Sequence, residues 1–401
     1  MTYLNAIKYL QSLSQDPRLF DDSAAVERMR ITCNSFDSFS RPLKCVHVCG
    51  DVGKDSCCLM LSSILENASY KVGRYSTPLE NDLKSCISIS GKSISYSDFA
   101  ETVTLIYRFY RSNFKEITPH RDEILTLAAI LYFQKESCDI AIFEKSYAKY
   151  HPVNITGAPV LSLITPFEDR QADSSIFENL IHKGTTETVS SPQHKEIYNA
   201  ISSACSLAGS RLTIPIYSEM EIEKITLFKT FFKYRRNDYS VKSFSPFQTV
   251  NAITAIEAAA SLNRVGANIS DEAIAKGVAS ASFDGKCETI SLNPTIILSS
   301  SCEKDRIDTL LASLAQVKEH LPSTINFYVD SSSDIDRADL SSLLAARNIA
   351  HGEILEIEQA GEIAKGLISS QDPSQSCAAV FIGSREFITQ TKNIILKHFG
   401  T

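Results

Sequence analysis

The segment from Val46 to Ser56 constrains the fold more than any other part of the sequence. It reads Val-His-Val-Cys-Gly-Asp-Val-Gly-Lys-Asp-Ser and is followed by an apolar segment that fits a helix. In such a loop, glycine lets backbone N–H groups turn toward a phosphate, the helix adds its positive end, lysine neutralises phosphate oxygens and a hydroxyl reaches magnesium. The segment therefore predicts a strand, a phosphate-binding loop and a helix.

Two aspartates make this loop unusual. Asp51 and Asp55 place carboxylates beside the expected position of a polyphosphate. A carboxylate within about 4 to 6 Å of a phosphate opposes binding unless a cation lies between the two groups. We therefore expect ATP to bind weakly or not at all. The short motif also leaves open a tight strand-to-helix turn that binds no nucleotide.

Apolar strands alternate with helices along the chain. Strands are predicted at 45–49, 140–143 and 160–164, helices at 55–67, 97–110 and 122–134, and an extended, hairpin-like segment at 213–241. Buried strands that alternate with helices are typical of a doubly wound parallel sheet, which binds ligands at the carboxyl ends of its strands. The phosphate-binding loop follows such a strand, so we expect it at this edge.

The alternation restarts after the stretch from Ser282 to Lys286. Strands are predicted at 295–298, 324–329, 353–357 and 378–382, and helices at 305–320, 337–348, 360–369 and 387–399. Four strand-helix units make a small Rossmann-like domain. We therefore expect an α/β fold with two domains, a P-loop nucleotide-binding domain at 1–284 and a Rossmann-like domain at 285–401.

Composition narrows the class of protein. The chain has 401 residues, is 43% hydrophobic and 22% charged, and carries a net charge of -7, which gives no electrostatic reason to expect nucleic acid or an anionic membrane as a partner. No signal peptide precedes the first helix, and the longest apolar run, from Ile124 to Phe133, is about half a membrane span. The 11 cysteines form no C-x-x-C pair, so we interpret them as small buried residues of a cytoplasmic protein.

The loop and several other segments match motifs of one known family. His47, Gly50, Gly53, Lys54 and Ser56 match a loop that reads His-Val-x-Gly-Thr-Asn-Gly-Lys-Gly-Ser. Further matches occur in the same order at 3–13, 26–29, 70–78, 87–99, 248–252 and 379–384. On these residues the chain resembles the folylpolyglutamate synthase and dihydrofolate synthase branch of the Mur ligase family, as a divergent member. The resemblance implies the Mur ligase fold, with a doubly wound ATPase-like domain and a C-terminal Rossmann-like domain.

The resemblance also implies a chemistry. Members of this family phosphorylate an acyl carboxylate with ATP, and the amine of an amino acid then attacks the acyl phosphate, while magnesium and a lysine neutralise the transferred group. ATP, Mg²⁺ and a folate-like or other acyl substrate are thus the implied ligands. By resemblance, the nucleotide-binding residues are Gly50, Gly53, Lys54, Ser56, Gln248, Asn251 and Lys286, the magnesium ligands are Ser56, Thr77 and Glu144, and the catalytic residues are Lys54 and Lys183, which matches a lysine that many members carbamylate. A solvated acid at Glu144 and a surface lysine at Lys183 are the alternatives.

Other motifs of the family are altered. Residues 145–154 read Lys-Ser-Tyr-Ala-Lys-Tyr-His-Pro-Val-Asn where the family has Gly-Leu-Gly-Gly-Arg-x-Asp-Ala-Thr-Asn. The metal-binding histidine has no counterpart and Arg170 stands in its turn, Cys302 replaces a histidine of the second domain, and Lys286 replaces an arginine. His151, or the three acids Asp51, Asp55 and Asp169, are the residues that remain to hold a metal instead.

The alterations bear on activity because each lost electrostatic group typically lowers a rate about a hundred- to a thousandfold. We therefore interpret the chain as a catalytically degraded paralogue of folylpolyglutamate synthase, a pseudoenzyme with a binding or regulatory role. One alternative is an active ATP- and Mg-dependent ligase that forms an amide bond with repositioned metal ligands. The other is a structural or partner-binding protein without nucleotide.

Overall fold

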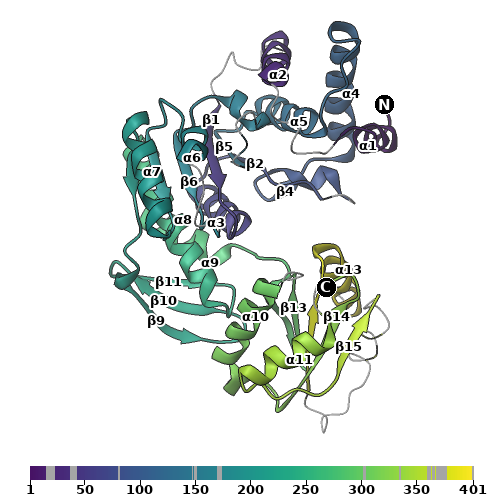
Figure 1. Cartoon of the computed structure of the whole chain (residues 1–401), viewed down its shortest axis with the longest axis vertical. Coiled ribbons are helices and arrows are strands. Elements are labelled where there is room, and N and C mark those ends of the chain that lie inside the picture. Colours follow the sequence, from purple (N-terminus) through teal and green to yellow (C-terminus); the bar gives the residue numbers. More distant parts are fainter. Residues whose placement is uncertain are drawn as a thin grey trace. The chain divides into compact units, whose positions relative to one another are not determined.

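The computed structural model describes residues 1–14, 23–36, 43–79, 82–146, 148, 151–168, 174–300, 304–333, 336–358, 363, 366 and 377–399 (Figure 1). The chain divides into two compact units. The first comprises Met1–Tyr217 and Asn251–Val278, and the second comprises Ser218–Val250 and Ala279–Thr401. The domain bounds expected from the sequence, 1–284 and 285–401, stay a prediction, because a compact unit is not by itself an independently folding domain.

An eight-stranded sheet forms the centre of the first unit. Its strand order is β4 (Lys92–Ser93), β3 (Ile87–Ile89), β2 (Val72–Tyr75), β5 (Ile140–Glu144), β1 (Lys44–Cys49), β6 (Leu161–Ile164), β7 (Glu187–Ser190) and β8 (Arg211–Thr213). Neighbours from β2 to β8 are parallel, whereas β3 and β4 run antiparallel. The carboxyl ends of β2, β5, β1, β6 and β7 therefore lie at one edge.

Helices cover this sheet in groups that can be followed in Figure 1. One core cluster joins strand residues such as Cys45 and Phe143 to α1 (Tyr3–Gln11), α2 (Ser23–Ser35), α4 (Tyr96–Asn113) and α5 (Arg121–Lys135). Another joins Cys49 and Ile164 to α6 (Ser174–Leu180) and α7 (Lys195–Ala208). The remaining helices of this part are α3 (Lys54–Asn67), α8 (Pro246–Arg264), α9 (Asp271–Ser280) and 3-10 turns at Leu83–Cys86, Pro152–Thr156 and Tyr217–Glu219.

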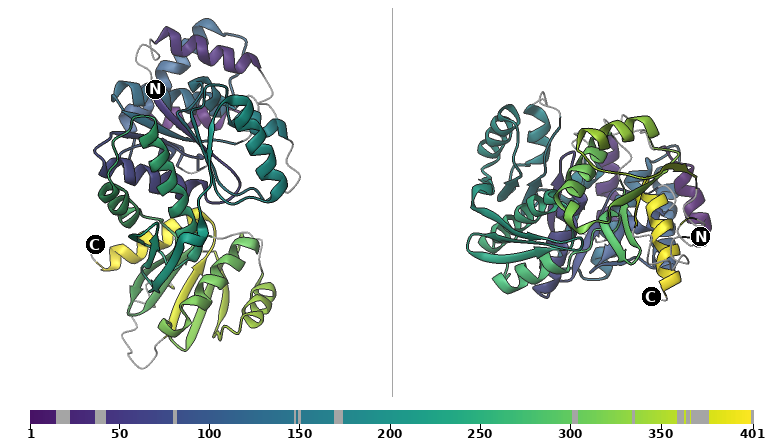
Figure 2. Two further views of the ribbon diagram at one scale, coloured as in Figure 1. Left: turned by 90° about the vertical axis from the view of Figure 1, so that its left-hand side faces the viewer. Right: turned by 90° about the horizontal axis from the view of Figure 1, so that it is seen from below.

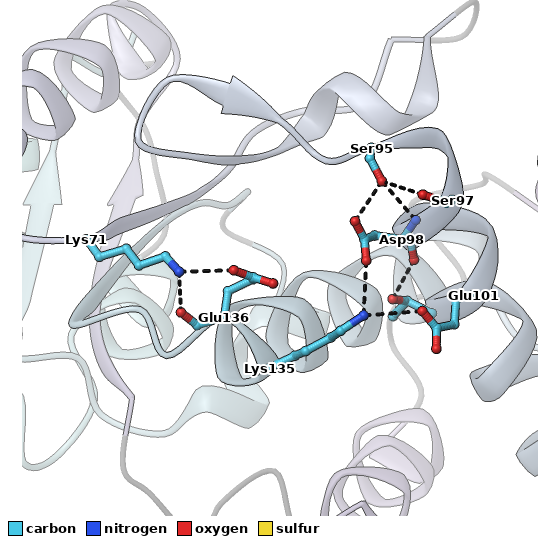
Figure 3. A network of polar contacts seen from close by, with 8 residues as sticks. Lys71, Ser95, Ser97, Asp98, Glu101, Lys135 and Glu136 are labelled. Carbon is cyan, nitrogen blue, oxygen red and sulfur yellow. Dashed lines mark hydrogen bonds and ion pairs between the residues drawn. The ribbon is translucent and has the colours of Figure 1, made fainter.

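A polar network links α4, α5 and the start of β2 (Figure 3). The Nζ of Lys135 lies 3.0 Å from Asp98 Oδ1 and 3.2 Å from Glu101 Oε2, and the Nζ of Lys71 lies 3.0 Å from Glu136 Oε2. These side chains are partly exposed, so each pair stabilises the fold by about 1 kcal/mol at most. The network joins elements of the fold and lies on none of the strand ends that bear the predicted site.

The second unit contains two sheets. The larger has the order β12 (Lys286–Leu292), β13 (Thr295–Ser299), β16 (Cys377–Ile382), β14 (Thr324–Asp330) and β15 (Ile354–Ile357), and only the β12–β13 pair is antiparallel. Helices α10 (Lys304–Gln316) and α11 (Arg337–Ala346) pack with one core cluster and α13 (Arg385–Phe399) with another, so they cover opposite faces (Figure 2). The smaller sheet is antiparallel and consists of β9 (Met220–Ile225), β10 (Thr230–Tyr234) and β11 (Asn237–Val241), and a 3-10 turn lies at Lys318–His320.

The expected fold class is confirmed, with an α/β sheet that carries the loop and a second α/β unit. The extended segment at 213–241 is the three-stranded sheet, and the helix expected at 360–369 falls almost entirely outside the described residues. Nine of the ten described cysteines are buried and all ten are free thiols. Among the described helices, none combines the length and the apolar character needed to span a bilayer.

Candidate functional site

The predicted loop lies at the carboxyl edge of the first sheet, between two neighbouring strand ends. β1 pairs with β5 so that Val48 faces Glu144, and the N–H of Lys145 then donates to Val48 O at 3.0 Å. On the other side, the N–H of Thr165 donates to Cys49 O at 2.7 Å. Residues that follow β5 and β6 are thus held beside the loop by main-chain hydrogen bonds.

Two glycines allow the loop its close approaches. Gly50 has φ +134°, and a Cβ there would lie 2.3 Å from Thr165 Oγ1. Gly53 has φ +85° at the N-cap of α3, and a Cβ there would lie 2.6 Å from Asn251 Oδ1. Positive φ values and such short distances exclude larger residues without strain. Asn251, predicted from the sequence to be near the nucleotide, therefore lies directly against the loop.

Lys54 folds back over the loop. Its Nζ donates to Gly50 O at 2.5 Å and to Asp51 O at 3.2 Å. The N–H groups of Asp51 and Val52 donate to Pro166 O at 2.9 and 3.3 Å, so they do not face a ligand. The anion-binding part of the loop is therefore confined to the first turn of α3, where helical N–H groups have no acceptor within the helix, together with the ammonium of Lys54.

Each of the two loop aspartates has a partner of its own. Asp55 Oδ1 lies 3.2 Å from Arg74 Nη1 on β2, with both side chains less than one-fifth exposed. Asp51 Oδ2 accepts a hydrogen bond from the N–H of Glu168 at 2.9 Å. The sequence argument for repulsion assumed carboxylates directed at the phosphate. Instead each carboxylate has a cation or a main-chain donor of its own, which reduces its effect on a bound anion.

A cavity of about 280 Å³ opens beside Lys54. Its lining residues are Gly50, Asp51, Lys54, Tyr75, Thr77, Pro78, Asp122, Glu144, Lys145, Ser146 and His151. The predicted residues Thr77 and Glu144 meet here, since the N–H of Thr77 donates to Glu144 Oε2 at 3.1 Å, and Glu144 is 8% exposed. The interpretation of Glu144 as a solvated strand-end acid is therefore wrong.

Lys145 is a buried cation in the same cavity. It is 2% exposed, and its Nζ donates to Asn154 Oδ1 and, at 3.2 Å, to Asn179 O. Burial lowers the pKa of Lys145 to about 8. Because this pKa lies above 7, the side chain is mostly charged at pH 7. Both acceptors are neutral, and no carboxylate in the described part of the chain forms an ion pair with Lys145.

Three histidines lie close enough to Lys145 for its charge to act on them. Burial and the charge of Lys145 lower the pKa of His151 to about 3 and of His182 to about 4, and hold the pKa of His47 well below its usual range. His47 Nε2 lies 2.8 Å from Thr156 Oγ1, and His151 Nδ1 accepts from the N–H of Val153 at 3.2 Å. All three are thus neutral near pH 7, and His151 is buried, with 8% of its surface exposed.

Comparison with known proteins shows which proteins the chain is similar to. No protein-family model matches the chain. The dihydrofolate synthase/folylpolyglutamate synthase of Bacillus subtilis is 25% identical over 299 residues, which are 69% of this chain and 68% of that protein. The dihydrofolate synthetase of Saccharomyces cerevisiae is 29% identical over 102 residues, 25% of this chain and 23% of that protein. The chain is a homologue of folylpolyglutamate and dihydrofolate synthases.

Solved structures extend the likeness of this folylpolyglutamate synthase homologue to the whole fold. The apo form of the Lactobacillus casei enzyme has a TM-score of 0.80 at 17% identity and covers 99% of this chain and 100% of that chain. A folylpolyglutamate synthase complex with AMPPCP and folate has a TM-score of 0.75 at 19% identity, with coverage of 99% and 100%. At these identities the structural matches establish the Mur ligase fold alone.

The magnesium site implied for this homologue has few protein donors. Within the described residues, no three His, Cys, Asp or Glu side chains gather as metal ligands. Glu144 already accepts from Thr77 N–H, Ser56 is buried without lining the cavity, and the next residue, Lys145, brings a positive charge. The described residues therefore do not fit a metal site in which protein carboxylates dominate, and Ser56, Thr77 and Glu144 as ligands stay a prediction.

The other predicted residues of the homologue are scattered. Lys183 is exposed and does not line the cavity, so its carbamylation stays a prediction. Gln248, buried near the start of α8, and Lys286, half-buried at the start of β12, belong to the second unit. The altered positions Asp169, Arg170 and Cys302 lie outside the described residues. A larger groove of about 640 Å³ along α1 and α4 contains none of the predicted residues.

Sequence reasoning missed Lys145 as a site residue. The available signal was its position directly after the buried strand 140–143, at the edge predicted to carry the loop, where the related enzymes have glycine. Its burial was not readable from the sequence, because it depends on a contact with Asn154, nine residues further on, and on the main chain of Asn179, which comes from another segment.

Proposed function

We propose that this chain binds the phosphates of a nucleotide at its loop and has lost most or all of the ligase turnover of folylpolyglutamate synthases. The observation that carries the proposal is the orientation of the two loop acids. Asp55 pairs with Arg74 and Asp51 accepts from the N–H of Glu168, so neither contact engages Lys54, whose ammonium can bind an anion at the start of α3. Solved complexes of fold relatives with AMPPCP support the same ligand class.

The loss of turnover is supported by the groups around Glu144. A buried ammonium at Lys145 lines the cavity in which the resemblance places a divalent cation. Like charges within a low-dielectric cavity repel, and each displaced electrostatic group typically lowers a rate about a hundred- to a thousandfold. Lys286 in place of arginine also removes a bidentate phosphate contact. On this proposal the protein is a paralogue of folylpolyglutamate synthase that binds a nucleotide and has a binding or regulatory role.

A second candidate is an active carboxylate-amine ligase acting on a folate-like or other acyl substrate. It is supported by the contact of Thr77 with Glu144 and by the approach of Asn251 to Gly53, since the resemblance implies all four as site residues. A protein with no nucleotide at all is the least supported candidate, because the loop retains its glycines and its lysine.

The test measures turnover and binding on one preparation. The intact protein is mixed with ATP, Mg²⁺, glutamate and dihydropteroate or a reduced folate, and phosphate release is followed. We expect none above background, while ATP binds and Lys54→Met weakens it about ten- to a hundredfold. Turnover near about one per second would establish the active ligase instead. Absence of ATP binding in the intact protein would overturn the proposal.

A further inference from the structure

The inference starts from the buried charge of Lys145. This side chain is 2% exposed, and among the described residues its ammonium donates to the neutral oxygens of Asn154 and Asn179 alone. Transfer of an ammonium out of water without an opposite charge is strongly unfavourable. Because Lys145 also lines a cavity, a bound anion is the natural partner for this charge.

The other charged groups of the cavity do not neutralise Lys145. Asp51 accepts from the N–H of Glu168 and Glu144 accepts from the N–H of Thr77. Asp122, which also lines the cavity, lies in the first turn of α5, where the helix end favours a negative charge. No ion pair joins any of these three carboxylates to Lys145 within the described part of the chain. The histidines at 47, 151 and 182, whose pKa values the charge of Lys145 helps to lower, are neutral near pH 7 and cannot neutralise it either.

The position of Lys145 identifies which anion it meets. Its N–H is bonded to Val48 O on the strand that leads into the loop, and Gly50 and Lys54 line the same cavity. An anion seated on the first turn of α3 therefore has Lys54 and Lys145 beside one continuous space. A volume of about 280 Å³ suits the terminal phosphates of a nucleotide better than a whole nucleotide.

We propose that Lys145 binds the terminal phosphate of the nucleotide and supplies the positive charge that a divalent cation supplies in other phosphate sites, so that binding does not require Mg²⁺. This proposal rests on the proposed function. The proposal explains why few metal donors gather in the described part of the chain. It also explains why the buried charge of Lys145 has no ion-pair partner among the described residues. The carboxylate of an acyl substrate is also an oxyanion that could pair with Lys145. A comparison of the affinities for ATP, ADP and folate shows whether Lys145 binds the terminal phosphate or this carboxylate.

The experiment is a calorimetric titration of ATP, of ADP and of folate into the intact chain, once in EDTA and once in MgCl₂. Lys145→Met keeps most of the length of the side chain and removes its charge. Lys44→Met is the matched control, because Lys44 is an exposed lysine at the opposite end of β1, the strand that leads into the loop. Thermal unfolding verifies that each variant is folded, and Lys145→Gln is the second variant, which retains a hydrogen-bonding group near Asn154.

The expected result is ATP binding of similar strength in EDTA and in MgCl₂. Lys145→Met then weakens ATP about ten- to a hundredfold and ADP much less, Lys145→Gln shows the same pattern, and Lys44→Met changes neither. Equal loss of ATP and ADP affinity, no loss in either variant, or wild-type binding that requires Mg²⁺ would each overturn the role of Lys145 while leaving nucleotide binding intact. A weaker affinity for folate alone would assign Lys145 to the acyl carboxylate, and no ATP binding in any condition would overturn the proposed function itself.

Discussion

The loop after β1 and the turn after β5 lie side by side at one sheet edge, and both carry unexpected charges. In the loop, Asp55 and Asp51 are compensated by Arg74 and by the N–H of Glu168. After β5, Lys145 is buried, and its acceptors in the part of the chain that the structure describes are the neutral oxygens of Asn154 and Asn179. The difference shows that an added charge need not disturb a binding site when the fold supplies a partner for it. A buried charge without such a partner indicates either a charged ligand or the loss of the catalytic activity.

The largest effect on stability and on ATP binding is expected for a substitution within the loop itself. In Gly50→Ala, the new Cβ meets Thr165 at 2.3 Å and a φ of +134° disfavours any L side chain. We expect a loss of about 3 to 5 kcal/mol in the free energy of unfolding, measured by urea denaturation, together with loss of ATP binding. Gly209→Ala is the control, since that glycine has φ +73° with open space around it, and it costs about 1 kcal/mol. Equal losses in the two variants would show that Thr165 does not restrict the loop.

The next largest effect is expected when Asp55 loses its ion-pair partner, Arg74. Arg74→Met leaves that carboxylate partly buried beside the loop without its cation, so we expect a loss of about 2 to 3 kcal/mol in stability and weaker ATP binding. Asp55→Asn in the same chain restores most of both quantities, because the unpaired charge is then gone. A double-mutant cycle measures the coupling, and a coupling near zero would mean that Arg74 does not shield Asp55.

A smaller effect concerns pH and the histidines around Lys145. The pKa of His182 is lowered from 6.5 to about 4 by burial and by Lys145. As the pH falls below about 6.5, the unfolded chain takes up the proton first, so the folded state loses stability until about pH 4. We expect His182 to account for about 1 to 2 kcal/mol between pH 6.5 and 4.5, and His151 acts in the same direction. His182→Gln should flatten the pH dependence of the urea midpoint, and an unchanged slope would contradict the lowered pKa.

The smallest effect distinguishes the two views of the loop acids. From the sequence alone, Asp51→Thr with Asp55→Gly is expected to relieve repulsion and tighten ATP binding. Since both carboxylates face other partners in the structure, we now expect the ATP dissociation constant to change less than about threefold. A tenfold tightening in calorimetry would show that the acids do oppose the phosphate.

The sequence predicts the fold of this chain better than its site. Strand and helix positions follow from hydrophobic alternation, and the loop residues Gly50, Gly53 and Lys54 were readable because their spacing has a local cause. The pairing of Asp55 with Arg74 and the burial of Lys145 involve segments that only the sheet brings together. Local patterns carry no information on such partners, so the charge of the loop was overestimated and Lys145 was overlooked.

The central claim is that the first turn of α3 binds nucleotide phosphate beside Lys145. Hydrogen exchange of the intact chain, with and without ATP in EDTA, tests it most directly because it reports each segment separately. We predict that ATP protects the amides at 50–57 and at 144–148, and that Lys54→Met abolishes this protection. Unchanged exchange at 50–57 at saturating ATP, or protection confined to other segments, would contradict the account.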